Sequence, residues 1–221
     1  VQGLTTMHAA AFAEHAAGLG AQAIMAMPPY LRHASRSGIT SYYRELATWG
    51  LPIIVQNAPP PIGTPLSPED LTRLAHEVDL VRYVKEESHP ILHRIRQTIE
   101  LAGQDLEGVF GGANGIHLVS ELERGACGNM PAGGLIDVQV KVFDLYAAGI
   151  AHDARELQTR LLDLLTVASM YGVAFHKYVL WKRGVIDSPT VRDPQAVHVD
   201  DQDAVAIARM WSLIADVAVV D

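Results

Sequence analysis

The sequence predicts an α/β fold built as a β/α barrel of the TIM (β/α)8 type, followed by helices. Over residues 1–135, short apolar runs alternate with segments of helical periodicity, which indicates a parallel sheet with right-handed crossovers. The sequence has no G-x-G-x-x-G pattern, which would mark the phosphate loop of a doubly wound sheet. Polar residues follow the apolar runs directly, where a barrel places its functional groups.

The individual elements follow from periodicity and from stop signals. Helices are expected where apolar residues recur at helical spacing, at residues 5–20, 41–48, 68–77, 90–101 and 116–123. Strands are expected at the short apolar runs, at residues 23–27, 51–55, 80–84, 108–110 and 126–130. Beyond these, only helices are expected, at residues 137–148, 153–170, 173–183 and 201–217. We therefore expect a partial barrel over residues 1–135 and C-terminal helices over residues 136–221.

The composition indicates a cellular compartment and excludes several classes of partner. The single cysteine, Cys127, cannot form an internal disulfide, so a cytoplasmic protein is expected. The net charge of -8 disfavours nucleic acid as a partner. No apolar run approaches the roughly 18 residues that span a bilayer, so no membrane association is expected. The ten histidines lack the spacing of a zinc site, and no metal is expected.

A lysine ends one of the apolar strands. Lys85 follows residues 81–84 directly, and an unpaired ammonium in a dry interior is unfavourable. An amine held away from water loses its proton more readily and can attack a ketone. The resulting iminium acidifies the adjacent carbon, so that a hydroxyl group or a carbon fragment can leave. The competing interpretation is a structural salt bridge of Lys85 with Glu86 or Glu87, and position alone favours the salt bridge.

Several segments resemble the motifs of one enzyme family in order and spacing. Residues 81–88 read V-R-Y-V-K-E-E-S, residues 20–30 end in Pro-Pro-Tyr, and residues 52–59 read P-I-I-V-Q-N-A-P. Residues 110–114 and 125–130 are rich in glycine. These segments resemble strands six, four, five, seven and eight of the dihydrodipicolinate synthase and N-acetylneuraminate lyase family, and Lys85 falls on the lysine that forms the family's Schiff base.

This resemblance implies an enzyme, a Schiff-base-forming lyase of the aldolase or dehydratase type that acts on a pyruvate-derived 2-keto acid. No organic cofactor is implied. Lys85 is the expected nucleophile, with Gln56 and Glu87 as further catalytic residues. The residues expected to bind substrate are Gly112, Met130, Tyr30 and Asn57. Family members often form dimers or tetramers, so the resemblance also implies a homo-oligomer.

The sequence departs from the family at the residues that define its branches. Gln56 stands where the family has a proton-relaying tyrosine, and an amide cannot act as a general acid or base. Proton transfer then falls to Glu87, to Tyr83 or to the substrate's own carboxylate. Pro61 stands where dihydrodipicolinate synthases proper have an arginine, which disfavours a role in lysine biosynthesis. The segment 177–186 resembles the branch that dehydrates 2-keto-3-deoxy sugar acids.

The family's first three strand and helix units have no counterpart here, so the chain is expected to begin at the end of the third strand. A barrel with five of its eight strands would have two open edges. An inactive fragment is therefore one alternative to the enzyme. A non-catalytic barrel relative that binds a ligand or serves in assembly is another, and a doubly wound nucleotide-binding domain is a third.

Overall fold

The computed structural model describes residues 1–30, 32, 34–60 and 64–218. The chain divides into two compact units, of which the first comprises Val1–Gly112 and Glu123–Asn129 and the second Ala113–Leu122 and Met130–Asp221. Pro61, which stands at the family's arginine position, lies outside the described residues. The expected domain boundary at residue 135 stays a prediction.

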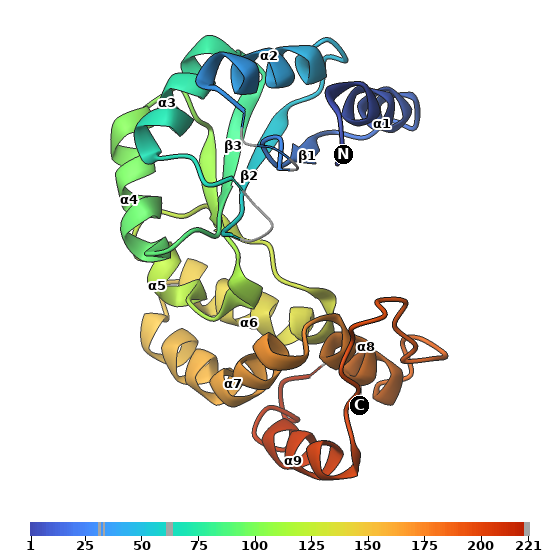
Figure 1. The fold of residues 1–221 in the computed structure, drawn as a ribbon. Coiled ribbons are helices and arrows are strands. Elements are labelled where there is room, and N and C mark those ends of the chain that lie inside the picture. The colour runs from blue at the N-terminus through green and yellow to red at the C-terminus, as the bar shows by residue number, and fades with distance from the viewer. Residues whose placement is uncertain (31, 33, 61–63, 219–221) are drawn as a thin grey trace. The chain divides into compact units, whose positions relative to one another are not determined.

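A parallel sheet forms the centre of the first unit (Figure 1). Its strands, as far as the chain is described, are β1 (Ile24–Ala26), β2 (Ile53–Asn57), β3 (Val81–Glu86), β4 (Gly108–Gly111) and β5 (Gly128–Asn129). They lie in the order β1-β2-β3-β4-β5, each parallel to its neighbour. Right-handed crossovers between strands in chain order place all connecting helices on one face, as in a barrel. A doubly wound sheet reverses its strand order at a switch point, so that alternative does not fit.

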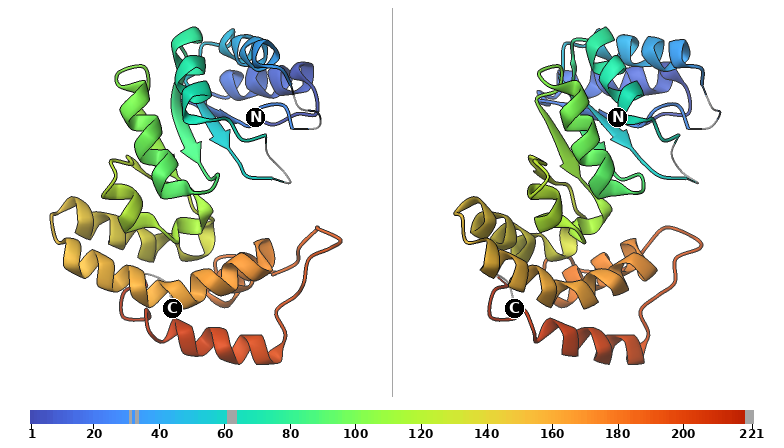
Figure 2. Two further views of the ribbon diagram at one scale, coloured as in Figure 1. Left: turned by 60° about the vertical axis from the view of Figure 1, so that its left-hand side comes forward. Right: turned by 90° about the vertical axis from the view of Figure 1, so that its left-hand side faces the viewer.

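The helices of the first unit are α1 (Thr6–Gly18), α2 (Arg36–Ala47), α3 (Pro68–Glu77) and α4 (Ile91–Ala102). Figure 2 shows α3 and α4 side by side along the sheet, where they contact β3 and β4. The expected start of α2 at residue 41 is wrong. Ser35 caps this helix by accepting a hydrogen bond from the Gly38 N–H at 3.2 Å, so the helix begins at Arg36.

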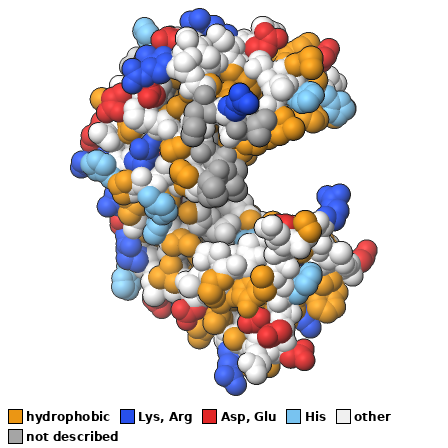
Figure 3. All heavy atoms as spheres, viewed as in Figure 1, with side chains coloured by type: hydrophobic (Ala, Val, Ile, Leu, Met, Phe, Trp, Pro, Cys, Tyr) orange, Lys and Arg blue, Asp and Glu red, His pale blue; other side chains and the backbone are white. Residues whose placement is uncertain are grey.

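Two large apolar side chains of α1 are exposed. Met7 and Phe12 are 72% and 52% exposed, and Figure 3 shows apolar side chains at the surface in the region of α1. The opposite face is buried, with Ala9 and Ala13 fully covered. Alanine on the inner face brings the helix close to the sheet, and the larger apolar residues are left outside.

The second unit is helical. Its described elements are the 3-10 helices η1 (Ala113–Gly115) and η2 (Gly133–Leu135) and the α-helices α5 (Leu118–Leu122), α6 (Ile136–Ala147), α7 (Ala151–Tyr171), α8 (Val173–Lys182) and α9 (Asp201–Trp211). Leu161, Leu164 and Phe175 are fully buried in its core. Asp200 caps α9 with its side chain. None of the helices among the described residues has both the length and the apolar character needed to cross a membrane.

A histidine is buried in this unit without hydrogen bonds. His176 on α8 is 7% exposed, and neither ring nitrogen has a hydrogen-bond partner within the described part of the chain. Its ring packs edge-on against Phe175, with ring centroids 5.3 Å apart. A side chain at Gly134 would place its Cβ 2.8 Å from Nδ1, so the glycine is required. Burial lowers the pKa of His176 below its ordinary value of 6.5.

The lowered pKa of His176 predicts a loss of stability in mild acid. Below about pH 6.5 the unfolded chain takes up a proton at this residue before the folded chain does. The free energy of unfolding should therefore fall as the pH drops below that value, by up to about 1.4 kcal/mol per pH unit. Urea unfolding followed by circular dichroism at several pH values measures the slope. His176→Phe should reduce the slope, whereas His152→Phe, at an exposed position of α7, should leave it unchanged. Equal slopes in the wild type and His176→Phe would contradict the prediction.

Candidate active site

The register of β2, β3 and β4 brings polar residues together near the carboxyl ends of these strands. Gln56 lies beside Lys85, and Lys85 lies beside Phe110 on β4. Residues paired in register on parallel strands point to the same face of the sheet. Asn57 and Glu86, one position further along, also pair and therefore point to the opposite face. The two faces of the sheet therefore carry different sets of polar side chains.

On the first face, one carboxylate joins two of the predicted catalytic residues. The Lys85 ammonium nitrogen lies 3.1 Å from Oε1 of Glu87. Nε2 of Gln56 donates a hydrogen bond of 2.8 Å to Oε2 of the same carboxylate. The side chains of Lys85 and Glu87 are only 11% and 17% exposed. The structure thus contains the salt bridge of the competing interpretation, and it forms with Glu87 instead of Glu86.

The Glu87 carboxylate occupies the space that a side chain at position 112 would fill. A Cβ at this position would lie 2.5 Å from Oε1 of Glu87 and 2.7 Å from its Cδ, which is closer than nonbonded atoms can approach. The carbonyl of Gly112 accepts a hydrogen bond of 2.9 Å from the side chain of Asn129 at the end of β5. A carboxyl group therefore already rests against the glycine that the sequence predicts to bind substrate.

On the opposite face, Asn57 and Glu86 form a buried network, and neither has any exposed surface. Nδ2 of Asn57 donates to Oε2 of Glu86 at 2.8 Å, and the N–H of Leu66 donates to Oδ1 of Asn57 at 2.8 Å. The N–H of Ser88 donates to Oε1 of Glu86 at 2.8 Å. Nε of Arg94, from α4, lies 3.4 Å from the same carboxyl group. This network joins β2, β3, α4 and the segment before α3.

The electrostatics of Glu86 reflect this burial. Removal from water raises the pKa of Glu86, and the contacts with Asn57 and Arg94 act in the opposite direction. The side-chain amide of Asn57 is engaged here, so its predicted contact with substrate stays a prediction. Arg94 is the member that sequence reasoning missed, because nothing in its context distinguishes it from the exposed Arg96 two residues later.

For the other predicted site residues, the structure gives other contacts than one with Lys85. Tyr30 follows β1 and lines a cavity of about 360 Å³ together with residues of the N-terminus and of α1. Met130 belongs to the second unit, so its predicted role stays a prediction. The Tyr83 hydroxyl donates to Glu107, and this bond raises the pKa of Tyr83. Among the described residues, no three His, Cys, Asp or Glu side chains form a group that could hold a metal ion.

Comparison with known sequences gives a consistent result. A model of the dihydrodipicolinate synthetase family matches residues 2–209. L-2-keto-3-deoxyarabonate dehydratase of Azospirillum brasilense is 33% identical over 212 residues, which are 93% of this chain and 68% of that enzyme. A 4-hydroxy-tetrahydrodipicolinate synthase of Mesorhizobium japonicum is 28% identical over 214 residues, which are 88% of this chain and 69% of the enzyme.

Solved structures resemble the chain as a whole. Dihydrodipicolinate synthase from Rhodopseudomonas palustris superposes with a TM-score of 0.86 at 25% identity, over 96% of this chain and 73% of that one. A catalytic lysine mutant of sialic acid aldolase from Ruminococcus gnavus superposes with a TM-score of 0.84 at 21% identity, over 97% of this chain and 71% of that one. These likenesses confirm the predicted fold class.

The buried network predicts that Glu86 is important for stability. Glu86→Ala removes the ion-pair partner of Arg94 and the acceptor of the buried Ser88 N–H, and it leaves the Asn57 amide with the Leu66 carbonyl as its acceptor, so it should lower the free energy of unfolding by about 3 kcal/mol. Urea denaturation at neutral pH measures the change. Glu100→Ala is the matched control, because Glu100 forms an exposed pair with Arg96 on the same helix. The control should change stability by less than about 0.5 kcal/mol. Equal effects of the two substitutions would show that the network does not hold the strand ends.

Proposed function

The chain belongs to the dihydrodipicolinate synthetase family, and on this premise we propose that it dehydrates a 2-keto-3-deoxy sugar acid through a Schiff base on Lys85. The proposal rests on the position of the Lys85 amine. Lys85 is the next-to-last residue of β3, its side chain is largely shielded from water, and its nitrogen lies 3.1 Å from a carboxylate oxygen of Glu87. The choice of substrate class is supported by the A. brasilense relative, which is a 2-keto-3-deoxyarabonate dehydratase.

The first step forms the iminium. The Lys85 ammonium first passes a proton to the Glu87 carboxylate 3.1 Å away, and the neutral amine attacks the C2 ketone. Glu87 then returns that proton to the carbinolamine hydroxyl, which leaves as water and gives a protonated imine. This cation withdraws electrons from C3, so that a C3 proton becomes acidic. The proposal assigns the removal of that proton to Glu87, whose carboxylate is already beside the amine.

The second step expels the hydroxyl group at C4. The enamine formed at C2 and C3 pushes its electron pair toward C4, and the hydroxyl group leaves as water with the proton that Glu87 took from C3. The net change is the loss of one water molecule, and hydrolysis of the conjugated imine returns the Lys85 amine. Gln56 donates a hydrogen bond to Oε2 of Glu87 and so orients the carboxylate without exchanging protons.

We assign substrate binding to residues around the Glu87 carboxylate. We place the substrate's own carboxylate at Gly112, where the absence of a side chain leaves space that Glu87 partly fills. Tyr30 and Met130 are the further substrate-binding residues of the proposal, and Asn57 is assigned the fixing of the β2 end beneath the substrate through its bond to Glu86. No organic cofactor or metal enters the reaction.

One observation also suits a non-catalytic relative. The Lys85–Glu87 pair would be present in a protein that uses this salt bridge only to fix the end of β3 and that serves as a ligand-binding or assembly module. In that case Lys85→Ala would leave the affinity for a keto acid unchanged. The two functions are therefore separated by covalent trapping at Lys85.

Borohydride should trap pyruvate on Lys85. Reduction of the folded protein with sodium borohydride in the presence of pyruvate should convert the imine into a stable secondary amine on Lys85. Peptide mass spectrometry locates the added mass. Lys85→Ala should lose the adduct, and Lys141→Ala, at an exposed position of α6, should keep it. Glu87→Gln should still be trapped but should dehydrate 2-keto-3-deoxyarabonate at least 100-fold more slowly, in line with the roughly 10²- to 10⁴-fold contribution of a general base. No adduct on the folded wild type would overturn the proposal.

We further propose that the protein acts in the cytoplasm as a homo-oligomer, with a small keto acid as its partner. The single cysteine fits a reducing compartment, and the exposed Met7 and Phe12 of α1 offer apolar contacts to a second copy. Sedimentation velocity at micromolar concentration should show a dimer or a tetramer, and Phe12→Ser should weaken the assembly. A single-chain species throughout would contradict this expectation.

A further inference from the structure

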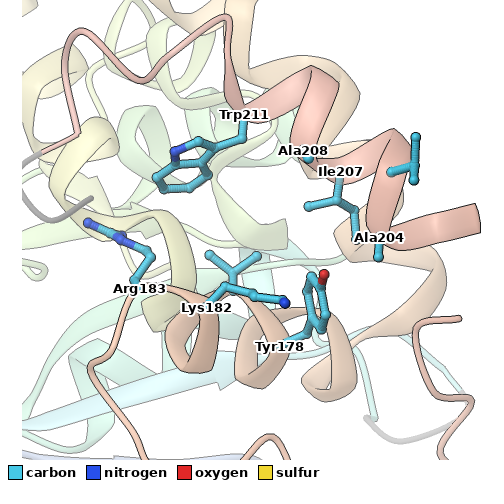
Figure 4. A pocket seen from close by; sticks show the side chains of 9 residues that line it. Tyr178, Lys182, Arg183, Ala204, Ile207, Ala208 and Trp211 are labelled. Carbon is cyan, nitrogen blue, oxygen red and sulfur yellow. The ribbon is translucent and has the colours of Figure 1, made fainter. Parts of the chain in front are cut away.

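A cavity between α8 and α9 of the second unit has no part in the proposed reaction. Both helices pack on α7, and the space that they leave has a volume of about 480 Å³. Val179 and Ile207 line it and are 2% and 4% exposed. Figure 4 shows Tyr178 of α8 and Trp211 of α9 directed toward this space. The lining is therefore apolar, with an aromatic ring from each helix.

Lys182, an exposed residue, lines the cavity with a positive charge that forms no ion pair with a carboxylate of the described residues. The ammonium nitrogen of Lys182 lies 4.6 Å from the ring centroid of Trp181 and 5.7 Å from that of Tyr178. Lys182 takes part in no ion pair with the residues that the structure describes. Its neighbour Arg183 differs, because Asp137 binds the guanidinium with hydrogen bonds of 3.0 Å and 2.6 Å. An anion that enters the cavity would therefore meet the charge of Lys182 first.

We infer that this cavity binds a small aromatic carboxylate. Its volume falls in the range of about 300 to 1,000 Å³ that is typical of small-molecule sites, which are mostly apolar with a few polar groups. Tyr178 and Trp211 each offer a ring to a planar aromatic ligand, since aromatic faces and edges attract one another. The carboxylate end is assigned to Lys182. Burial raises the pKa of Tyr178, and the negative charge of Asp201 raises it further. Because Asp201 is close enough to act on Tyr178, a carboxylate is disfavoured at the Tyr178 end of the cavity.

The charge requirement is tested with a pair of probes that differ only in charge. 1-Naphthoate and the neutral 1-naphthamide have the same ring and nearly the same shape, and isothermal titration calorimetry gives the affinity of each for the purified chain. 1-Naphthoate should bind more tightly than the amide. Lys182→Met should lower the affinity for naphthoate by about two- to fivefold, which is the effect expected for a partly exposed ion pair. The affinity for the amide should not change. Lys141→Met on α6 is the matched control and should change neither affinity.

The location is tested by filling the cavity. Ala208 lines it from α9 and is exposed, so Ala208→Trp should abolish the binding of both probes while the circular dichroism spectrum stays that of the wild type. Equal affinities of the two probes, or naphthoate binding that neither Lys182→Met nor Ala208→Trp reduces, would overturn the inference. A concentration-dependent dimer that Ala208→Trp dissociates would also overturn it, because a second copy would then occupy the cavity.

Discussion

The hydrogen bonds between Asn57 and Glu86 are the interaction on which the candidate site depends. Both side chains are fully buried, so the carboxyl group has lost its contact with water and must be compensated by protein donors. Asn57 on β2 and Ser88, just after β3, supply hydrogen bonds, and Arg94 on α4 supplies an opposite charge. Because the compensation works in one geometry only, the ends of β2 and β3 are held in register.

This register gives two adjacent acidic residues opposite tasks. Glu86 points to the helix side of the sheet and contacts Arg94 on α4, whereas Glu87 follows the strand end and meets Lys85 and Gln56. Alternation along the strand is the physical cause, since each step of one residue reverses the face. A shift of one residue between β2 and β3 would separate Gln56 from Lys85 and bring Asn57 beside it. The buried network on the helix side of the sheet therefore fixes the positions of Lys85, Gln56 and Glu87 on the other side.

Much of this arrangement follows from the sequence, and some of it does not. Periodicity and proline or glycine stops predict the elements, and the expected helix at residues 68–77 coincides with α3. The start of α2 is missed because Ser35, Ser37 and Gly38 resemble a loop, although Ser35 is a cap. Alternation predicts that Glu86 faces the helices. It cannot predict Arg94, because that contact depends on how the helix packs after the turn.

The salt bridge of Lys85 with Glu87 and a catalytic role for both residues are compatible. An imine on Lys85 that carries a proton keeps the positive charge of the ammonium, so the attraction to Glu87 persists when the substrate becomes covalently bound. Both side chains are largely shielded from water, which strengthens this attraction. Gln56 occupies the second oxygen of Glu87 as a donor and cannot take a proton from it. In the proposed reaction, the ion pair of the resting site would therefore hold the carboxylate beside the carbon atoms next to the imine, where a proton has to be removed.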